Sequence, residues 1–376
     1  MKKDNTIEAF FALIRAGLWE SEVQLASYGE VDYEFVLRIA REQSVVGLVA
    51  AGLEHVTDVK APQVVALQFA GETLQLEQRN KAMNVFISEQ VSIMRRNGIY
   101  ALLVKGQGVA QCYERPLWRS CGDIDYFLSN ENYVKARSYF DTLYQKNEEE
   151  LLNEQHLSYT ADGWEVELHG TMRTALLKRV DLQIDAVKQG IFNQGRIRVW
   201  RNNKTDIFLP EQNDDVILVF THFLKHFYNG GIGLRQICDW CRLLWTFRNS
   251  LNISLLEDRI RKMGVMSEWR AFASLAVNFL GLPIDSTPLY SPSNKWKRKA
   301  ARIVNYIFKT GNFGHNRDCT YYTKYSLFIR KAISLKVHLS DFFRQLMIFP
   351  VNSALVFFRL FCGGVNEALK EFISGK

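Results

Sequence analysis

Two aspartates stand two positions apart in the run Asp123-Ile124-Asp125-Tyr126-Phe127-Leu128. The run has the composition of a buried strand, and side chains two positions apart on a strand point to the same face. Parallel carboxylates repel each other unless a cation lies between them, and carboxylate oxygens bind hard divalent cations such as Mg²⁺. The spacing therefore predicts a Mg²⁺ site at Asp123 and Asp125. The alternative is a pair of solvated or capping residues.

A lysine and a glycine follow the preceding apolar run, Ile99 to Val104, in the turn Lys105-Gly106-Gln107-Gly108. A backbone without Cβ lets a phosphate approach closely, and a lysine supplies countercharge. We expect the Lys105 ammonium to reach the cleft that Asp123 and Asp125 border.

A third carboxylate stands in the alternating segment Trp164-Glu165-Val166-Glu167-Leu168-His169. Its polar residues would share one face of a strand while its apolar residues face the core. A third carboxylate beside the aspartate pair is what a two-metal phosphoryl-transfer site requires. Glu167 is preferred to Glu165 because it lies nearer the strand end and flanks His169. An exposed polar face is the alternative, and His169 reads equally well as a core or a catalytic histidine.

These motifs occur in an order that resembles a known family. The chain is similar to the uncharacterised bacterial nucleotidyltransferase family of the DNA polymerase β superfamily, over about residues 30 to 250. The matching residues are Lys105-Gly106, Tyr113, Arg119, Gly122-Asp123-Ile124-Asp125, Glu167-Leu168-His169, His222, His226, Arg235 and Asp239.

The resemblance implies a small mixed-sheet core and a set of roles for the matched residues. Asp123, Asp125 and Glu167 would be the catalytic residues and the ligands of two Mg²⁺ ions. Arg119 would brace the carboxylates or a phosphate. The residues implied to contact the nucleotide are Lys105, Gly106, Gln107, Arg119, His169, Lys225, His226 and Arg235.

The implied reaction is in-line attack of an acceptor oxygen on the α-phosphorus of a nucleoside triphosphate, with pyrophosphate leaving. The acceptor, a hydroxyl or phosphate on a small molecule, sugar phosphate, protein or RNA, is not identified. A catalytically inactive nucleotide-binding or regulatory module is the alternative. It is favoured by Gln107, which stands where most of the superfamily has serine.

The elements that must position these residues form three regions. Residues 1–97 read helical, with one long helix from Pro62 to Arg96. Residues 98–210 alternate strands and helices, with hairpins around Ala161-Asp162-Gly163 and through Asn202-Asn203. Residues 211–376 read helical again. The expected fold is α+β, with a small mixed sheet flanked by N- and C-terminal helical regions and rich in helix overall.

Charge is distributed unevenly along the 376 residues, whose net charge is +7. Residues 293–376 contain 15 Lys and Arg against 4 Asp and Glu, whereas the preceding residues contain 32 against 36. The basic C-terminal quarter is either a solvated helix face or a surface for an anionic partner such as a nucleic acid or membrane. With 47% apolar and 23% charged residues, a disordered chain is excluded.

Cysteine usage and hydropathy favour a cytoplasmic protein. The six cysteines are scattered, and Cys238 and Cys241 read as packed helical thiols, since no second pair supplies further zinc ligands. The N-terminal residues read as an amphipathic helix and not as a secretion signal. The most apolar stretch, Leu346 to Cys362, is interrupted by Pro350, Asn352 and Arg359, so no transmembrane segment is expected.

Overall fold

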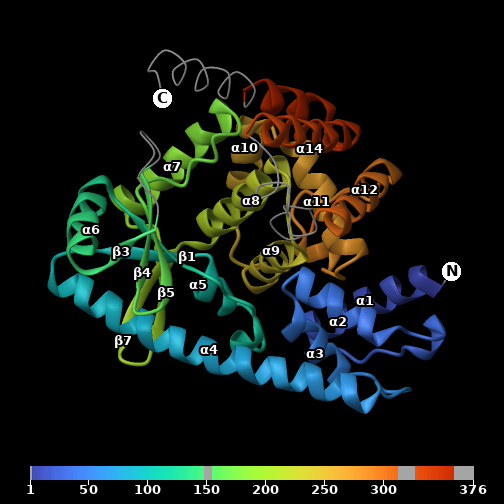
Figure 1. Cartoon of the computed structure of the whole chain (residues 1–376). Helices are drawn as coiled ribbons and strands as arrows, with labels where there is room; N and C mark the ends of the chain where they lie inside the picture. The colour runs from blue at the N-terminus through green and yellow to red at the C-terminus, as the bar shows by residue number, and fades with distance from the viewer. Residues whose placement is uncertain (1, 148–154, 312–326, 360–376) are drawn as a thin grey trace.

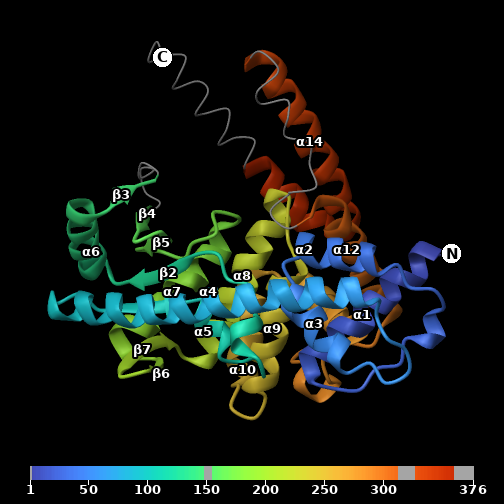
Figure 2. The ribbon, with the colours of Figure 1, turned by 60° about the horizontal axis from the view of Figure 1, so that its bottom comes forward.

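The computed structural model describes residues 2–147, 155–311 and 327–359. A twisted sheet lies at one side of the molecule and a mass of helices at the other, with the long helix α4 running under both (Figures 1 and 2). The predicted region boundaries fall between elements, after α4 and after β7. One hydrophobic core contains residues from all three regions, from Ala9 to Val356. The division of the chain into three domains remains a prediction.

The N-terminal helices are α1 (Lys2–Trp19), α2 (Tyr33–Glu42) and α3 (Val46–Glu54), with a 3-10 turn η1 at Ala26–Tyr28. Glycines allow α1 and α3 to pack backbone against backbone. A Cβ added at Gly17 would lie 1.9 Å from the carbonyl oxygen of Leu48, and one at Gly52 would lie 2.0 Å from that of Leu13. Any side chain at these positions would force the two helices apart.

Helix α4 (Gln63–Arg96) confirms the long helix expected from the sequence. It begins directly after Pro62, whose fixed φ suits a helix start, and it ends before Gly98, which has a φ of 68°. Val65 and Phe69 in its first half belong to the core that joins the three regions. Met83 and Phe86 in its second half belong to a separate core under the sheet.

The sheet has seven strands among the described residues, in the order β3-β4-β5-β2-β1-β7-β6. Strand β2 is parallel to β5, β1 is parallel to β7, and the remaining neighbours are antiparallel. This mixed sheet in a helix-rich chain confirms the expected α+β class. The strands are β1 (Ala101–Val104), β2 (Ile124–Leu128), β3 (Gln145–Lys146), β4 (His156–Ala161), β5 (Trp164–His169), β6 (Ile197–Asn202) and β7 (Thr205–Pro210).

Both expected hairpins are present. Strands β4 and β5 are joined by Asp162-Gly163, with φ values of 50° and 83°, the left-handed conformation that a tight hairpin turn needs. Strands β6 and β7 are joined through Asn203, with a φ of 53°, so this turn falls one residue later than expected. Asparagine adopts this conformation more readily than most residues.

Helices cover both faces of the sheet. The side chains of β1 alternate between the two cores that these helices form with the sheet. Leu103 packs in the core with α4 and α6, whereas Leu102 and Val104 pack in the core with α7 and α8. Helix α7 lies in a stretch to which the sequence analysis assigned no element. These helices and the short elements nearby are α5 (Gly106–Ala110), η2 (Pro116–Trp118), α6 (Asn130–Leu143), α7 (Lys178–Gln194) and α8 (Gln212–Asn229).

The remaining helices form the C-terminal region. They are α9 (Leu234–Thr246), α10 (Ile253–Met263), α11 (Met266–Asn278), α12 (Asn294–Thr310) and α14 (Leu327–Ile348), with a 3-10 turn η3 at Ile284–Ser286. Residues 350–359 are also helical, and residues 312–326 and 360–376 of the region expected to be helical lie outside the described residues. No described helix is long and apolar enough to cross a membrane.

Candidate active site

Three carboxylates converge on the face of the sheet that α7 and α8 cover. Asp125 lies on β2, Asp123 directly precedes that strand, and Glu167 lies opposite Asp125 in the parallel pairing of β2 with β5. One oxygen from each of the three lies within 4.8 Å of the others. Asp125 is 1% exposed. The pKa of Asp123 is raised by the nearby charge of Asp125 and by burial. Three oxygen donors that repel one another fit a hard divalent cation.

The Lys105 ammonium reaches this cluster from the end of β1. Its Nζ lies 2.6 Å from Oδ1 of Asp125. Burial opposes the charge of Lys105, but the three carboxylates outweigh it and raise its pKa. Lys105 and Gly106 both have positive φ, 57° and 39°. A positive φ is uncommon at a lysine, and such strained residues gather at functional sites.

Gly106 packs closely against the loop that leads into β2. A Cβ at this position would lie 3.3 Å from Sγ of Cys121 and 3.4 Å from the carbonyl oxygen of Asp123. The absence of a side chain thus lets the turn after β1 lie beside the first aspartate of the cluster.

Two histidines are hydrogen-bonded to the carboxylates. His169 Nε2 lies 2.7 Å from Oδ1 of Asp125 and 3.1 Å from Oε2 of Glu167. His156 Nε2, on the neighbouring strand β4, lies 3.1 Å from the same Oε2. Burial opposes the charge of His169, but its bonds to Asp125 and Glu167 raise its pKa. Although burial alone would raise the pKa of Glu167, the two histidines hold it well below its usual range.

Arg119 does not contact the carboxylate cluster; it pairs instead with Asp239 on α9. Its Nε and Nη2 donate to the two oxygens of Asp239 at 2.8 and 2.6 Å, and Tyr113 donates to Oδ1 of the same carboxylate at 2.8 Å. Arg119 and Asp239 are 6% and 5% exposed. Three of the motif residues therefore join the sheet region to α9. On α9, Arg235 donates to the carbonyl oxygen of Ser120 at 3.0 Å.

Gln107 turns its side chain away from the cluster and toward α4. Its Nε2 donates to Oδ1 of Asn80 at 2.8 Å, and the glutamine is 1% exposed. Asn80 in turn donates to the carbonyl oxygens of Leu117 and Arg119 at 2.7 and 2.8 Å. The glutamine side chain thus ties the turn after β1 to α4, and contact of Gln107 with a phosphate would have to come from its backbone.

Helix α8 brings two histidines and a lysine to the other side of the site. His222 and His226 are one turn apart, and their Nε2 atoms lie 3.0 Å from each other. Burial and the charges of Lys105 and Lys225 lower the pKa of His226 to about 4. Burial and Lys105 likewise lower the pKa of His222 well below its usual value. Lys225 is half-buried on the same helix.

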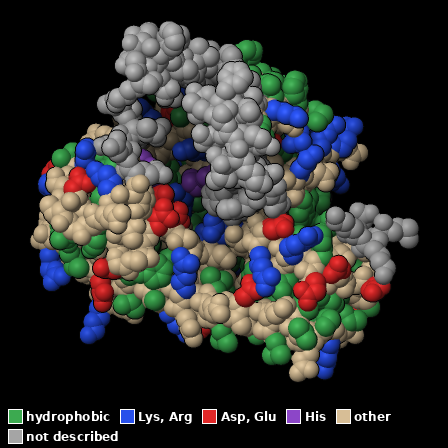
Figure 3. Space-filling view, viewed as in Figure 1, with side chains coloured by type: hydrophobic (Ala, Val, Ile, Leu, Met, Phe, Trp, Pro, Cys, Tyr) green, Lys and Arg blue, Asp and Glu red, His purple; other side chains and the backbone are tan. Residues whose placement is uncertain are grey.

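A pocket between the sheet and the helices collects most of the candidate residues. It reaches from the carboxylates to α8 and α9, and in Figure 3 histidine and basic side chains are visible in the central hollow of the molecule. The candidate residues that do not line it are Gln107, Glu167, His169, Lys225 and His226. Its lining comprises Lys105, Gly106, Val109, Arg119, Asp123, Asp125, Val219, His222, Arg235, Gln236 and Asp239.

A family model described as uncharacterised nucleotidyltransferase matches residues 29–281. The chain belongs to this nucleotidyltransferase family. The match includes the whole sheet, the carboxylate cluster and helices α8 to α11. No curated protein and no solved structure matched.

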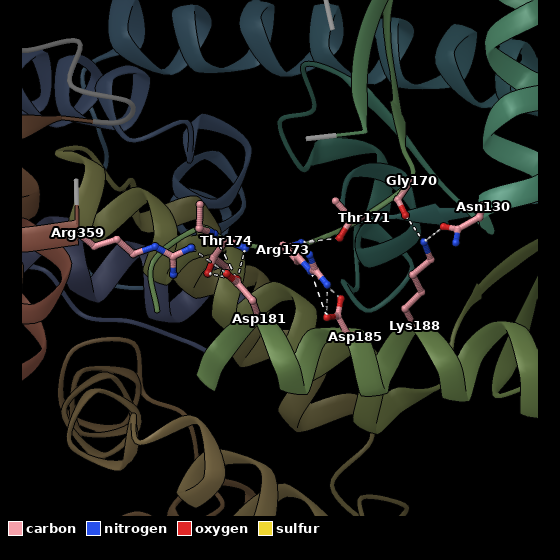
Figure 4. Close-up of polar contacts among 10 residues, drawn as sticks. Asn130, Gly170, Thr171, Arg173, Thr174, Asp181, Asp185, Lys188 and Arg359 are labelled. Atoms are coloured by element: carbon pink, nitrogen blue, oxygen red, sulfur yellow. Dashed lines mark hydrogen bonds and ion pairs between the residues drawn. The ribbon is translucent and has the colours of Figure 1, made fainter. Parts of the chain in front are cut away.

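In this member of the family, helix α7 fixes the segment that leaves β5 just after Glu167 and His169 (Figure 4). Lys188 donates to the carbonyl oxygen of Gly170 and to Asn130 Oδ1. Arg173 forms a bidentate pair with Asp185 at 2.5 to 3.1 Å. Asp181 accepts from the backbone and hydroxyl of Thr174 and lies 3.6 Å from Arg359. These contacts hold the end of β5 in place.

His156 is the residue of this site that the sequence analysis did not single out. The sequence did contain a signal for it. A two-residue turn at Asp162-Gly163 pairs Ala161 with Trp164, and counting outward along the hairpin then pairs His156 with His169.

Proposed function

We propose that this protein moves a nucleoside monophosphate from a nucleoside triphosphate to an acceptor hydroxyl or phosphate, with release of pyrophosphate. The observation that carries the proposal is the meeting of Asp123, Asp125 and Glu167, with oxygens within 4.8 Å, beside the Lys105 ammonium. Membership of the family supports the reaction class.

The proposed cofactor is Mg²⁺, as two ions held by Asp123, Asp125 and Glu167. The all-carboxylate donor set and the raised pKa of Asp123 support this assignment, because both indicate a need for positive charge. Bound there, the ions would neutralise the triphosphate and stabilise the charge that develops on the attacking and leaving oxygens.

The chain's own residues would bind and orient the nucleotide. Lys105 neutralises Asp125 and would donate to a phosphate when a nucleotide is bound, while Gly106 lets the turn that carries Lys105 pack against the loop that leads into β2. Arg235, in the same pocket, is a second cation within the site. Glu167 suits the role of a metal ligand better than that of a general base, because its lowered pKa makes it a weak acceptor of protons.

The proposal is tested by Mg²⁺-dependent pyrophosphate release in the presence of a cell extract that supplies acceptors. Asp123→Asn should reduce release by on the order of 100-fold or more. Asp162→Asn is the matched control, because it removes one carboxylate from a hairpin turn whose conformation asparagine tolerates. Pyrophosphate release by Asp123→Asn at the wild-type rate would refute the assignment. Nucleotide binding without any release by the wild type would favour the inactive module.

A further inference from the structure

Beside the carboxylate cluster lies a second group of potential ligands, His156, Glu167 and His169. The two histidines face each other across the antiparallel pairing of β4 with β5, and their ring centroids are 4.8 Å apart. Both Nε2 atoms lie 3.1 Å from one atom, Oε2 of Glu167. The three ligand atoms all lie within 4.8 Å of one another. The nitrogens of two imidazoles thus converge on one carboxylate oxygen.

The distances fit a tetrahedral metal ion. A zinc-like ion binds imidazole nitrogen and carboxylate oxygen at about 2.0 to 2.2 Å, which places neighbouring ligand atoms roughly 3.3 to 3.5 Å apart. The two nitrogen–oxygen separations of 3.1 Å are close to this edge length. We propose that His156, Glu167 and His169 form a binding site for a first-row transition metal ion of the zinc class, distinct in ligand chemistry from the Mg²⁺ site.

The two imidazole ligands determine which class of metal ion this site would bind. Mg²⁺ prefers oxygen ligands and dehydrates reluctantly, whereas zinc, cobalt and related ions bind imidazole well. The site is also reachable, because the His156 side chain is 31% exposed while those of Glu167 and His169 are 20% and 10% exposed. Three protein ligands leave a fourth position for water or a substrate oxygen, as in catalytic zinc sites.

The site shares one residue with the proposed catalytic cluster. Glu167 belongs to both groups, and a carboxylate with two oxygens can bridge two cations. His169 also lies 2.7 Å from Oδ1 of Asp125, so an ion at the histidines would lie next to the aspartates. The transition metal site does not require nucleotidyl transfer to occur, and metal binding alone can test it.

The test is a Co²⁺ titration of the full chain after removal of metals by a chelator, followed by visible absorption and performed with excess Mg²⁺ to fill the carboxylate site. The wild type should bind one equivalent of Co²⁺ with the intense bands of a tetrahedral ion. His156→Gln removes a ligand but keeps a hydrogen-bond donor toward Glu167, and it should weaken Co²⁺ binding by about 100-fold or more. His55→Gln is the matched control, because His55 also pairs with a glutamate, Glu20, at 2.8 Å.

Asp123→Asn separates the two sites. This variant should retain the Co²⁺ bands while losing Mg²⁺-dependent turnover. The experiment therefore tests the transition metal site separately from the proposed function. Three results would overturn the proposal: no tetrahedral Co²⁺ spectrum in the wild type, unchanged Co²⁺ affinity in His156→Gln, or loss of the spectrum in Asp123→Asn. Any of these would leave the three residues as a hydrogen-bonded cluster only. Thermal unfolding of His156→Gln checks that the variant is folded.

Discussion

Asp123 and Glu167, two carboxylates of the cluster, respond in opposite ways to their surroundings. Asp123 lies near the charge of Asp125 and has a raised pKa, whereas Glu167 accepts from two histidines and has a lowered one. A carboxyl whose folded pKa is raised contributes stability that is present below its unfolded pKa and is lost as the pH rises through the folded pKa. Ionised Asp123 therefore destabilises the metal-free protein at neutral pH, while ionised Glu167 stabilises it.

Neutral substitutions at these two positions should consequently have opposite effects. At pH 7 without divalent metal, Asp123→Asn should raise the free energy of unfolding by about 1 kcal/mol, and Glu167→Gln should lower it by about 1 to 3 kcal/mol. Urea unfolding measures both. Added Mg²⁺ should then raise the melting temperature of the wild type but not that of Asp123→Asn. A loss of stability in Asp123→Asn would mean that its carboxylate is not under repulsion.

Lys105 is the residue expected to exchange partners when a nucleotide binds. Lys105→Met keeps the apolar stem and removes the charge, so binding of a nucleoside triphosphate should weaken by about 1.5 to 3 kcal/mol, or roughly 10- to 150-fold in Kd. Because Lys105 also pairs with buried Asp125, the variant should be less stable. Binding is therefore measured by calorimetry at a temperature where both proteins are folded. If the variant binds the nucleoside triphosphate with wild-type affinity, the Lys105-Gly106 turn has only a structural role.

At the scale of elements, local sequence patterns predicted the long helix α4 and both hairpins, because each depends on signals within a few residues. Helix α7 was missed although Val180, Ile184, Val187 and Ile191 repeat at helical spacing and are buried. The partner of Arg119 could not be predicted in this way, since Asp239 lies 120 positions further along the chain. Contacts between distant elements come from the tertiary packing of α9 against the sheet region.

Gln107 illustrates the same difficulty within the site itself. Its place in the motif implied contact with a phosphate, but its side chain bonds to Asn80 on α4. Gln107→Ser, which installs the residue common in the superfamily, should cost about 1 to 3 kcal/mol because it leaves buried Asn80 Oδ1 without its donor. It should not strengthen nucleotide binding. Denaturant unfolding and calorimetry measure the two effects. Tighter nucleotide binding with unchanged stability would indicate that the side chain at position 107 contacts a phosphate.

At the scale of the whole molecule, the site lies where the sheet meets the C-terminal helices, and the half-buried histidines His222 and His226 lie at this junction. When the pKa of a histidine is lower in the folded than in the unfolded protein, protonation of that histidine lowers the free energy of unfolding. The unfolded chain binds that proton near pH 6.5, whereas folded His226 binds it near pH 4. The contribution of His226 is therefore present above pH 6.5 and is lost as the pH falls toward 4.

We expect the free energy of unfolding to fall between pH 6.5 and 4, with about 3 kcal/mol of the fall due to His226. Lys105, Lys225 and Arg235 oppose its protonation, and Asp125 favours it. Urea unfolding of the wild type and of His226→Gln across this range isolates the contribution, since other titrating groups are common to both. Parallel pH profiles for the two proteins would show that His226 is not held neutral.

The C-terminal region also presents a basic surface on helix α12. Lys295, Lys297, Arg298 and Arg302 are exposed along α12, and Lys and Arg side chains gather over this helix in Figure 3. Trp296 and Ala300 on the opposite side are buried. This pattern is that of an amphipathic helix with a solvated basic face. An anionic partner for that face remains a prediction.

The central claim is that the α-phosphate of a nucleoside triphosphate is transferred at the carboxylate cluster. The most direct measurement follows two labels in parallel, one on the α-phosphate and one on the γ-phosphate, with wild-type protein, Mg²⁺ and a cell extract. The α label should appear in an acceptor and the γ label in pyrophosphate, and neither should move with Asp123→Asn. Transfer of the γ label to an acceptor, or transfer of the α label by Asp123→Asn as fast as by the wild type, would contradict the account.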